Sequence, residues 1–196
     1  PFQGLFTQGM VCHETYKDEN NKWLSPNEVE TDDGKKFFLK KNPKIKVKVG
    51  PPESMSKSKK NTIDPENIIN DYGADAVRLF ILSDSPPAKD VQWSDQGMKS
   101  AYKFVQKFWI MHKKIVGLIN SKNSKKNSSS ISEFTNQLID KVTNNLEKFH
   151  YNVIIANFYE TYNFLNKEIE KDINSDDLFI NYSKILQIMH PVLPHI

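Results

Sequence analysis

Cysteine is almost absent from the 196-residue sequence, in which Cys12 is the only one. A single cysteine excludes an internal disulfide and any cysteine-rich zinc site, which is typical of a reducing compartment. No stretch approaches the roughly 20 apolar residues that span a membrane, and the N-terminus lacks a signal-peptide pattern. These absences predict a soluble intracellular protein in which Cys12 is a small core residue rather than a nucleophile.

Arginine is nearly absent as well, because lysine supplies every positive side chain except Arg78. The formal net charge of +3 hides an uneven distribution, with ten lysines and one acid, Glu53, between Lys35 and Lys60. A basic segment of this kind favours a polyanionic partner whose affinity depends on salt. A lysine-rich surface that only solubilises the protein is the alternative, and composition leaves both open.

The histidines form no cluster that suggests a metal or catalytic site, and each fits an ordinary surface or core position. They are His13, His112, His150, His190 and His195. The sequence opens on Pro1, and a strand-like stretch from Leu5 to Val11 follows without a lead-in. We therefore expect this chain to be a piece of a longer protein.

A short basic loop from Ser54 to Lys60 is the most informative stretch. Hydroxyl and ammonium side chains alternate along it, as in a lining for phosphate, and Met55 is its only large apolar residue. Asp64 then offers an N-cap and Pro65 fits the first position of a helix. By itself, a run of this kind is also typical of a solvated surface loop.

The residues around this loop resemble a known family. Met55-Ser56-Lys57-Ser58 matches four of the five residues of the K-M-S-K-S signature of class I aminoacyl-tRNA synthetases. The chain resembles the leucine enzymes of bacterial or organellar type most, because Lys59-Lys60-Asn61 follows where the isoleucine, valine and methionine enzymes have a glycine before the asparagine. Other stretches similar to the family are Gln8-Gly9-Met10-Val11, Asp64-Pro65, Tyr72-Gly73-Ala74-Asp75-Ala76-Val77-Arg78, Ser85-Pro86-Pro87 and Trp93.

The resemblance implies an α/β fold followed by an all-α fold. Residues 1–90 would be the end of a Rossmann-type catalytic domain, with a short leucine-specific insertion at about 25–50 and the signature loop at 54–58. Residues 91–196 would be part of an anticodon-binding-type helical bundle. The family's H-x-G-H motif and editing region would lie outside this sequence, and the protein would work in the bacterial cytoplasm or an organellar matrix.

The implied reaction is activation of leucine by ATP, with Mg2+ bound to the ATP, and transfer of the leucyl group to tRNA(Leu). Lys57 would stabilise the leaving pyrophosphate, and no protein metal site or membrane contact is expected. Ser54 replaces the first lysine of the signature, and Lys59 or Lys60 is the expected substitute for its charge. The candidate ATP-binding residues are Met55, Ser56, Lys57 and Ser58, and Gln8, Gly9 and Met10 are expected near the active site.

Several helices and strands follow from local patterns. Asp33-Gly34 predicts a hairpin between residues 28–30 and 37–39, and residues 45–49 alternate as a strand with a lysine-bearing face. Helices are expected at 65–72, at 74–83 with Val77, Phe80 and Ile81 buried, and at 95–120. A polar linker at 121–130 precedes three more helical patterns, which begin at Phe134, Ile154 and Phe179.

Candidate tRNA contacts are lysines that share a surface and the single arginine: Lys59, Lys60, Arg78, Lys99, Lys103 and Lys107. Two other readings stay open at this point. The chain would be either a non-catalytic tRNA-binding helical module or a subunit of a split synthetase. A pure RNA-binding module predicts no adenylate chemistry in any longer version of the protein.

Overall fold

The computed structural model describes residues 4–32, 34, 36–122, 129–171 and 173–196. The chain divides into two compact units. The first, here called the strand unit, comprises Pro1–Asp71 and Ala88–Ser94, and the second, the helical unit, comprises Tyr72–Pro87 and Asp95–Ile196. The domain boundary expected near residue 90 stays a prediction about the intact protein.

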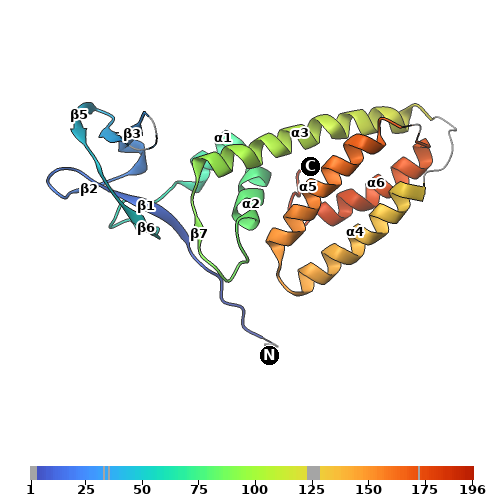
Figure 1. The fold of residues 1–196 in the computed structure, drawn as a ribbon, viewed down its shortest axis with the longest axis horizontal. Coiled ribbons are helices and arrows are strands. Elements are labelled where there is room, and N and C mark those ends of the chain that lie inside the picture. The colour runs from blue at the N-terminus through green and yellow to red at the C-terminus, as the bar shows by residue number, and fades with distance from the viewer. Residues whose placement is uncertain (1–3, 33, 35, 123–128, 172) are drawn as a thin grey trace. The chain divides into compact units, whose positions relative to one another are not determined.

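The strand unit contains two small sheets and one short α-helix (Figure 1). Its strands are β1 (Val11–Lys17), β2 (Trp23–Leu24), β3 (Val29–Thr31), β4 (Phe37–Leu39), β5 (Asn42–Lys46), β6 (Lys48–Ser54) and β7 (Val91–Gln92). The 3-10 helix η1 (Pro26–Glu28) and α1 (Pro65–Tyr72) complete it. Strand β1 is central, since it pairs with β2 and β6 in antiparallel fashion and with β7 in parallel.

The second sheet has the order β3-β4-β5, and the expected hairpin between β3 and β4 is confirmed. Val47 lies between β5 and β6 and packs with Tyr16 and Leu24, while Phe37 and Leu39 cover this small cluster. The predicted strand at 45–49 is therefore interrupted at Val47, whose N–H donates to the carbonyl of Phe37. This apolar cluster therefore packs the second sheet, β3-β4-β5, against β1 and β2.

The strand expected from Leu5 to Val11 is wrong. The strand begins at Val11 and continues to Lys17, and Leu5 is 91% exposed. The physical reason is that β6 pairs only with residues from Cys12 onward, so the polar run His13-Glu14-Thr15 takes the strand conformation. Cys12 is buried, as expected.

The helical unit consists of α2 (Ala74–Ser83), α3 (Asp95–Asn120), α4 (Ser129–Glu147), α5 (Tyr151–Glu168) and α6 (Ser175–Met189). Figure 1 shows α4, α5 and α6 beside the long α3, and α2 packs against α3 and α5. The expected helices at 65–72, 74–83 and 95–120 are confirmed with these ends. None of the helices in the described part of the chain is long and apolar enough to cross a membrane.

The buried faces differ in detail from the expected ones. On α2 the buried residues are Asp75, Ala76, Leu79 and Phe80, whereas Val77 and Ile81 are half-buried. On α3 the buried residues include Met98 and Met111, whereas the apolar Val116 is exposed. Phe179 of α6 is 56% exposed. These shifts are rotations of about one position, because neighbouring helices decide which side of an apolar stripe is covered.

The polar linker expected at 121–130 is shorter than predicted, because Ser129 and Ser130 already belong to α4. Residues 123–128 of that linker lie outside the described residues.

A histidine and a tyrosine form a hydrogen bond between two helices of this unit. Nδ1 of His112 on α3 lies 2.9 Å from the hydroxyl oxygen of Tyr182 on α6. Burial lowers the pKa of His112 and raises that of Tyr182, so it favours the neutral form of both groups.

Candidate functional site

The signature loop, defined as Ser54 to Lys60, leaves the sheet at the end of β6. The N–H of Met55 donates to the carbonyl of Val11 at 3.2 Å, which fixes the first loop residue against β1. A turn follows, closed by the Lys60 N–H and the Lys57 carbonyl at 3.3 Å, and Lys60 has a φ of 54°. The chain then enters α1, where Asp64 Oδ1 accepts from the Glu66 N–H at 3.0 Å. The predicted N-cap is confirmed.

The charges of the loop are not equivalent. Lys57 and Lys60 are exposed, whereas Lys59 pairs with Glu53 at the end of β6. Of the two lysines expected to replace the missing signature lysine, only Lys60 is therefore left without this carboxylate. The hydroxyls of Ser56 and Ser58 lie 2.7 Å apart and share a hydrogen bond. Met55 is half-buried, in keeping with an anchoring side chain.

Glu28, the last residue of η1, lies near Lys60 of the loop. The pKa of Glu28 is lowered, first by the hydrogen bond that the Ser25 N–H donates to it and further by the charges of Lys60 and Lys41. The carboxylate of Glu28 therefore stays ionised and caps η1. Of the loop lysines, Lys60 therefore lies close enough to this carboxylate for the two charges to interact.

Gln8, Gly9 and Met10 lead directly into Val11, whose carbonyl holds the loop. At Gly9 a Cβ atom would lie 2.1 Å from the carbonyl oxygen of Lys89, so only glycine fits this close approach of two backbones. The Met10 N–H donates to Asp90 Oδ1 at 2.8 Å. These contacts confirm that Gly9 allows another backbone to approach. They place residues 9–10 against residues 89–91, on the β7 side of β1, whereas the loop leaves from β6 on the opposite edge of that strand.

Asn61 is a residue of the site that sequence reasoning did not single out. Its side chain is 0% exposed, although it follows a run of exposed lysines. Its Oδ1 accepts from the Ser56 N–H at 2.8 Å, and its Nδ2 donates to the carbonyls of Glu53 at 3.1 Å and His13 at 3.2 Å. The sequence contains it only as the end of the run Lys59-Lys60-Asn61, and no local pattern indicates its contact with His13, which lies 48 positions away.

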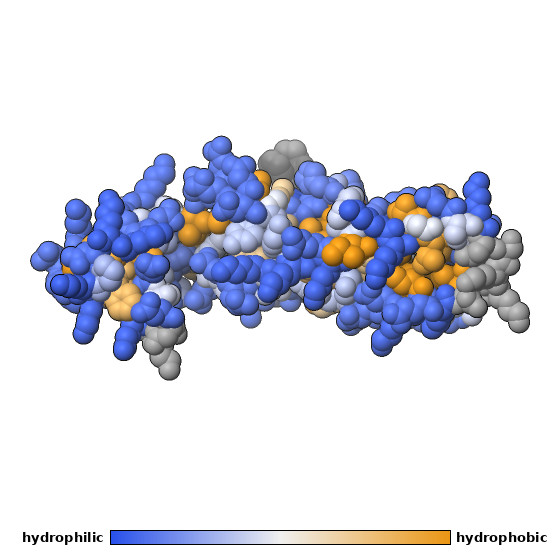
Figure 2. All heavy atoms as spheres, turned by 90° about the horizontal axis from the view of Figure 1, so that it is seen from above, coloured by the Kyte–Doolittle hydropathy of each residue, from blue (hydrophilic) through white to orange (hydrophobic). Residues whose placement is uncertain are grey.

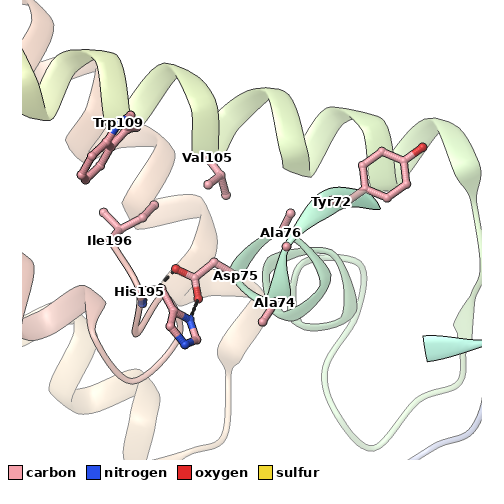
Figure 3. A pocket seen from close by; sticks show the side chains of 9 residues that line it. Tyr72, Ala74, Asp75, Ala76, Val105, Trp109, His195 and Ile196 are labelled. Carbon is pink, nitrogen blue, oxygen red and sulfur yellow. Dashed lines mark hydrogen bonds and ion pairs between the residues drawn. The ribbon is translucent and has the colours of Figure 1, made fainter. Parts of the chain in front are cut away.

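A second polar cluster lies within the helical unit. Asp75 of α2 is buried, and its carboxylate accepts from His195 at both Nδ1 (2.8 Å) and the backbone N–H (3.0 Å), as Figure 3 shows. Arg78, one turn later, donates to the carbonyls of Val192 at 2.9 Å and Pro191 at 2.6 Å. Asp75 and Arg78 thus join the Y-G-A-D-A-V-R stretch at the start of α2 to residues 191–195 near the end of the chain.

A cavity of about 460 Å³ lies beside this cluster. It is lined by Trp109, Val105, Asp75, His195 and neighbouring residues, and it contains no residue of the signature loop.

The guanidinium of Arg78 donates to backbone carbonyls of the chain itself, so its expected contact with tRNA stays a prediction. Among the described residues, no group of three or more histidine, cysteine or acidic side chains is arranged to hold a metal ion.

The lysines expected to follow a phosphate backbone lie on α3. Lys99, Lys103 and Lys107 are all exposed on one stripe, and Lys114 continues it. Figure 2 shows one face of the molecule, which is mostly hydrophilic and carries several apolar patches. The stripe carries positive charge over several turns of a rigid element, which suits an extended polyanion.

Comparisons with known proteins match two family models along the chain. Residues 49–94 match the family model of class I tRNA synthetases for isoleucine, leucine, methionine and valine. Residues 128–196 match the anticodon-binding domain of tRNA ligases. Leucine–tRNA ligases of Rickettsia bellii and Rickettsia felis are 43% and 42% identical over all of this chain. The chain spans 23% of the length of each of these relatives.

Two solved structures share the fold. A LeuRS from Agrobacterium radiobacter K84, in a ternary complex with tRNA and LeuAMS, aligns with a TM-score of 0.62 and 23% identity over 73% of this chain and 19% of that one. A methionyl-tRNA synthetase of Mycobacterium tuberculosis, with methionyl-adenylate, aligns with a TM-score of 0.58 and 15% identity over 72% of this chain and 33% of that one. At these identities the likeness concerns the fold alone.

Proposed function

Because the chain belongs to the class I aminoacyl-tRNA synthetases and corresponds to a portion of a leucine–tRNA ligase, we propose that it contributes the pyrophosphate-facing loop and tRNA-binding helices of that enzyme. The intact ligase would join leucine to ATP, releasing pyrophosphate, and then pass the leucyl group to tRNA(Leu). In this proposal the leucine pocket, the H-x-G-H motif and the editing region belong to other parts of the protein. Mg2+ would arrive on the phosphates of ATP.

The observation that carries the proposal is the exposed Lys57 on an anchored loop. Negative charge builds on the pyrophosphate as the leucine carboxylate attacks the α-phosphorus. A lysine that contacts this charge only in the transition state lowers the barrier without tightening the binding of ATP. Lys57 fits because no acidic side chain pairs with it in the described chain, whereas Lys59 is held by Glu53.

Ser56 and Ser58 would assist as hydroxyl donors to the same phosphates. Their hydroxyls lie 2.7 Å apart, close enough for both to contact one phosphate group. Met55 would hold the loop by its partly buried side chain. Residues 8–10 would lie beside the reacting groups, since they continue into the strand that binds the loop.

The helical unit would bind tRNA. Lys99, Lys103 and Lys107 repeat every four residues, and a lysine stripe of this kind neutralises phosphates whatever their sequence. Residues 91–196 would then act as the anticodon-binding-type domain and residues 1–90 as the end of the catalytic domain, with 25–50 as the leucine-specific insertion.

The test is leucine-dependent exchange of pyrophosphate into ATP, measured in a complete ligase that contains this sequence. Lys57→Ala should lower kcat by roughly 10²-fold, the lower end for loss of one oxyanion donor, and should change KM for ATP by less than about threefold. Lys184→Ala on α6 makes the same change of charge at an exposed site and should have no effect. Equal losses in kcat and in ATP affinity would contradict the transition-state role.

The 196-residue chain alone is expected to show no exchange. Activity of the chain alone would show that the catalytic machinery is complete here. A tRNA-binding module without catalysis predicts that no longer version forms leucyl-adenylate, so the complete ligase separates the two readings.

A further inference from the structure

The pairing of β1 with β6 is irregular at the point where the signature loop begins. Thr15 lies opposite Gly50, whereas His13 lies opposite Glu53, so β6 carries an extra residue between them. That stretch of β6 contains Pro51 and Pro52, which have no backbone N–H and cannot donate to a neighbouring strand. The β1–β6 pair therefore lacks two backbone N–H donors just before the loop.

The side chain of Asn61 supplies donors at this place. Its Nδ2 donates to the carbonyl of His13 on β1 and to that of Glu53 on β6, which are register partners. A carboxamide has two N–H donors and an acceptor oxygen, and its Oδ1 accepts from the Ser56 N–H inside the loop. One side chain therefore joins both strands to the residue directly before Lys57.

Burial makes these hydrogen bonds costly to break. Asn61 is 0% exposed, so water does not replace its partners without an opening of the loop. An unsatisfied buried polar group is much less favourable than a solvated one. Asparagine fits both in chemistry and in size. Aspartate has the same length but lacks the N–H donors, and glutamine is one methylene longer.

We propose that Asn61 is a positioning residue that sets the direction in which the signature loop leaves the sheet, and so the place of the Lys57 ammonium. This inference rests on the proposed role of Lys57. A displacement of about 1 Å of a group that stabilises a transition state costs on the order of 10²-fold in rate. Asn61 acts through the backbone at Ser56 and touches no substrate.

The first experiment uses the 196-residue chain and does not depend on catalysis. Hydrogen exchange of the Ser56 amide is compared in the unsubstituted chain, in Asn61→Ala, in Asn61→Asp and in Thr62→Ala. Thr62 is the exposed neighbour of Asn61 and serves as the matched control. The rates of tryptic cleavage after Lys57, Lys59 and Lys60 give a second measure of loop opening.

Asn61→Ala should speed exchange at Ser56 and tryptic cleavage on the order of 10²-fold, because three hydrogen bonds of the buried side chain are lost. Asn61→Asp should behave in the same way, because a carboxylate cannot donate to the two carbonyls. Thr62→Ala should match the unsubstituted chain. Wild-type exchange at Ser56 in both Asn61 variants would overturn the inference.

The second experiment uses the complete ligase. Both Asn61 variants should lower kcat for pyrophosphate exchange at least tenfold, with KM for ATP changed by less than about threefold. Asn61→Ala combined with Lys57→Ala should be no slower than Lys57→Ala alone, since the two residues act as one unit. Additive losses would mean that Asn61 does not act through Lys57, and would overturn the positioning role.

The two experiments separate this inference from the proposed function. If Lys57→Ala leaves the exchange reaction unchanged, the catalytic role of Lys57 fails, while the amide exchange of Ser56 still decides whether Asn61 holds the loop. If the Asn61 variants open the loop and kcat is unchanged, the inferred link between loop position and rate is overturned.

Discussion

Gly9→Ala tests whether the pairing of β1 with β7 depends on a close backbone approach. The added Cβ would lie 2.1 Å from the carbonyl oxygen of Lys89 and 2.2 Å from its carbonyl carbon. These are backbone atoms, so no side-chain rotation relieves the clash. Gly4→Ala is the matched control, because a Cβ at Gly4 meets nothing within 4 Å.

The expected cost follows from the hydrogen bonds that cross this close approach. A real Cβ essentially never lies within 3.0 Å of such atoms, so the two segments must separate by roughly 1 Å. Three bonds are then stretched out of range: Met10 N–H to Asp90 Oδ1 at 2.8 Å, Val91 N–H to the Met10 carbonyl at 2.9 Å, and Trp93 N–H to the Cys12 carbonyl at 2.8 Å. At about 1 kcal/mol each, the loss is about 3 kcal/mol.

Hydrogen exchange at the Val91 and Trp93 amides measures this loss locally in the 196-residue chain. About 3 kcal/mol corresponds to an increase of exchange on the order of 10²-fold, whereas amides of α4, α5 and α6 should be unchanged. Gly4→Ala should leave all of them unchanged. Unaltered exchange at Val91 and Trp93 in Gly9→Ala would refute the account of this strand edge.

Two further predictions concern the helical unit. Replacing Lys99, Lys103 and Lys107 together by glutamine should weaken the binding of tRNA, and the slope of log affinity against log salt should fall by about 1 for each lysine–phosphate ion pair removed. A filter-binding series at several salt concentrations measures this, and the triple replacement of the exposed Lys148, Lys167 and Lys184 is the control; equal slopes in both would argue against the α3 stripe. Asp75→Ala removes both hydrogen bonds to His195 and should lower the free energy of unfolding by about 2–3 kcal/mol in urea titrations. Asp84→Ala, an exposed acid at the other end of α2, should be nearly neutral, and a similar loss there would point to a general charge effect.

Local signals in the sequence predicted the helices well. Asp64 and Pro65 define the start of α1, and Gly73, with a φ of 81°, separates α1 from α2. The start of α3 at Asp95 and the hairpin between β3 and β4 were also predicted. Caps, glycines and prolines act through the backbone of their own few residues, so they can be read without knowledge of the fold.

Strand positions and polar contacts between distant residues were not predictable in this way. β1 is a strand because β6 pairs with it, and its run His13-Glu14-Thr15 has little apolar alternation. The contact between Asn61 and His13 spans 48 positions, and that between Asp75 and His195 spans 120. No local pattern connects residues so far apart. The Y-G-A-D-A-V-R motif was recognised, but the partners of its Asp75 and Arg78 were not.

The serine at position 54 changes where the loop carries its charge. Ser54 is the last residue of β6 and lies opposite Cys12, so a lysine there would start from the rigid sheet rather than from the turn. Lys59 is neutralised by Glu53, and Lys60 lies close enough to Glu28 to lower the pKa of that acid. In the proposed reaction, Lys57 is therefore the lysine of the loop that contacts the developing negative charge. A single flexible lysine is useful only if its backbone is held in place, which is what the buried amide of Asn61 does at Ser56.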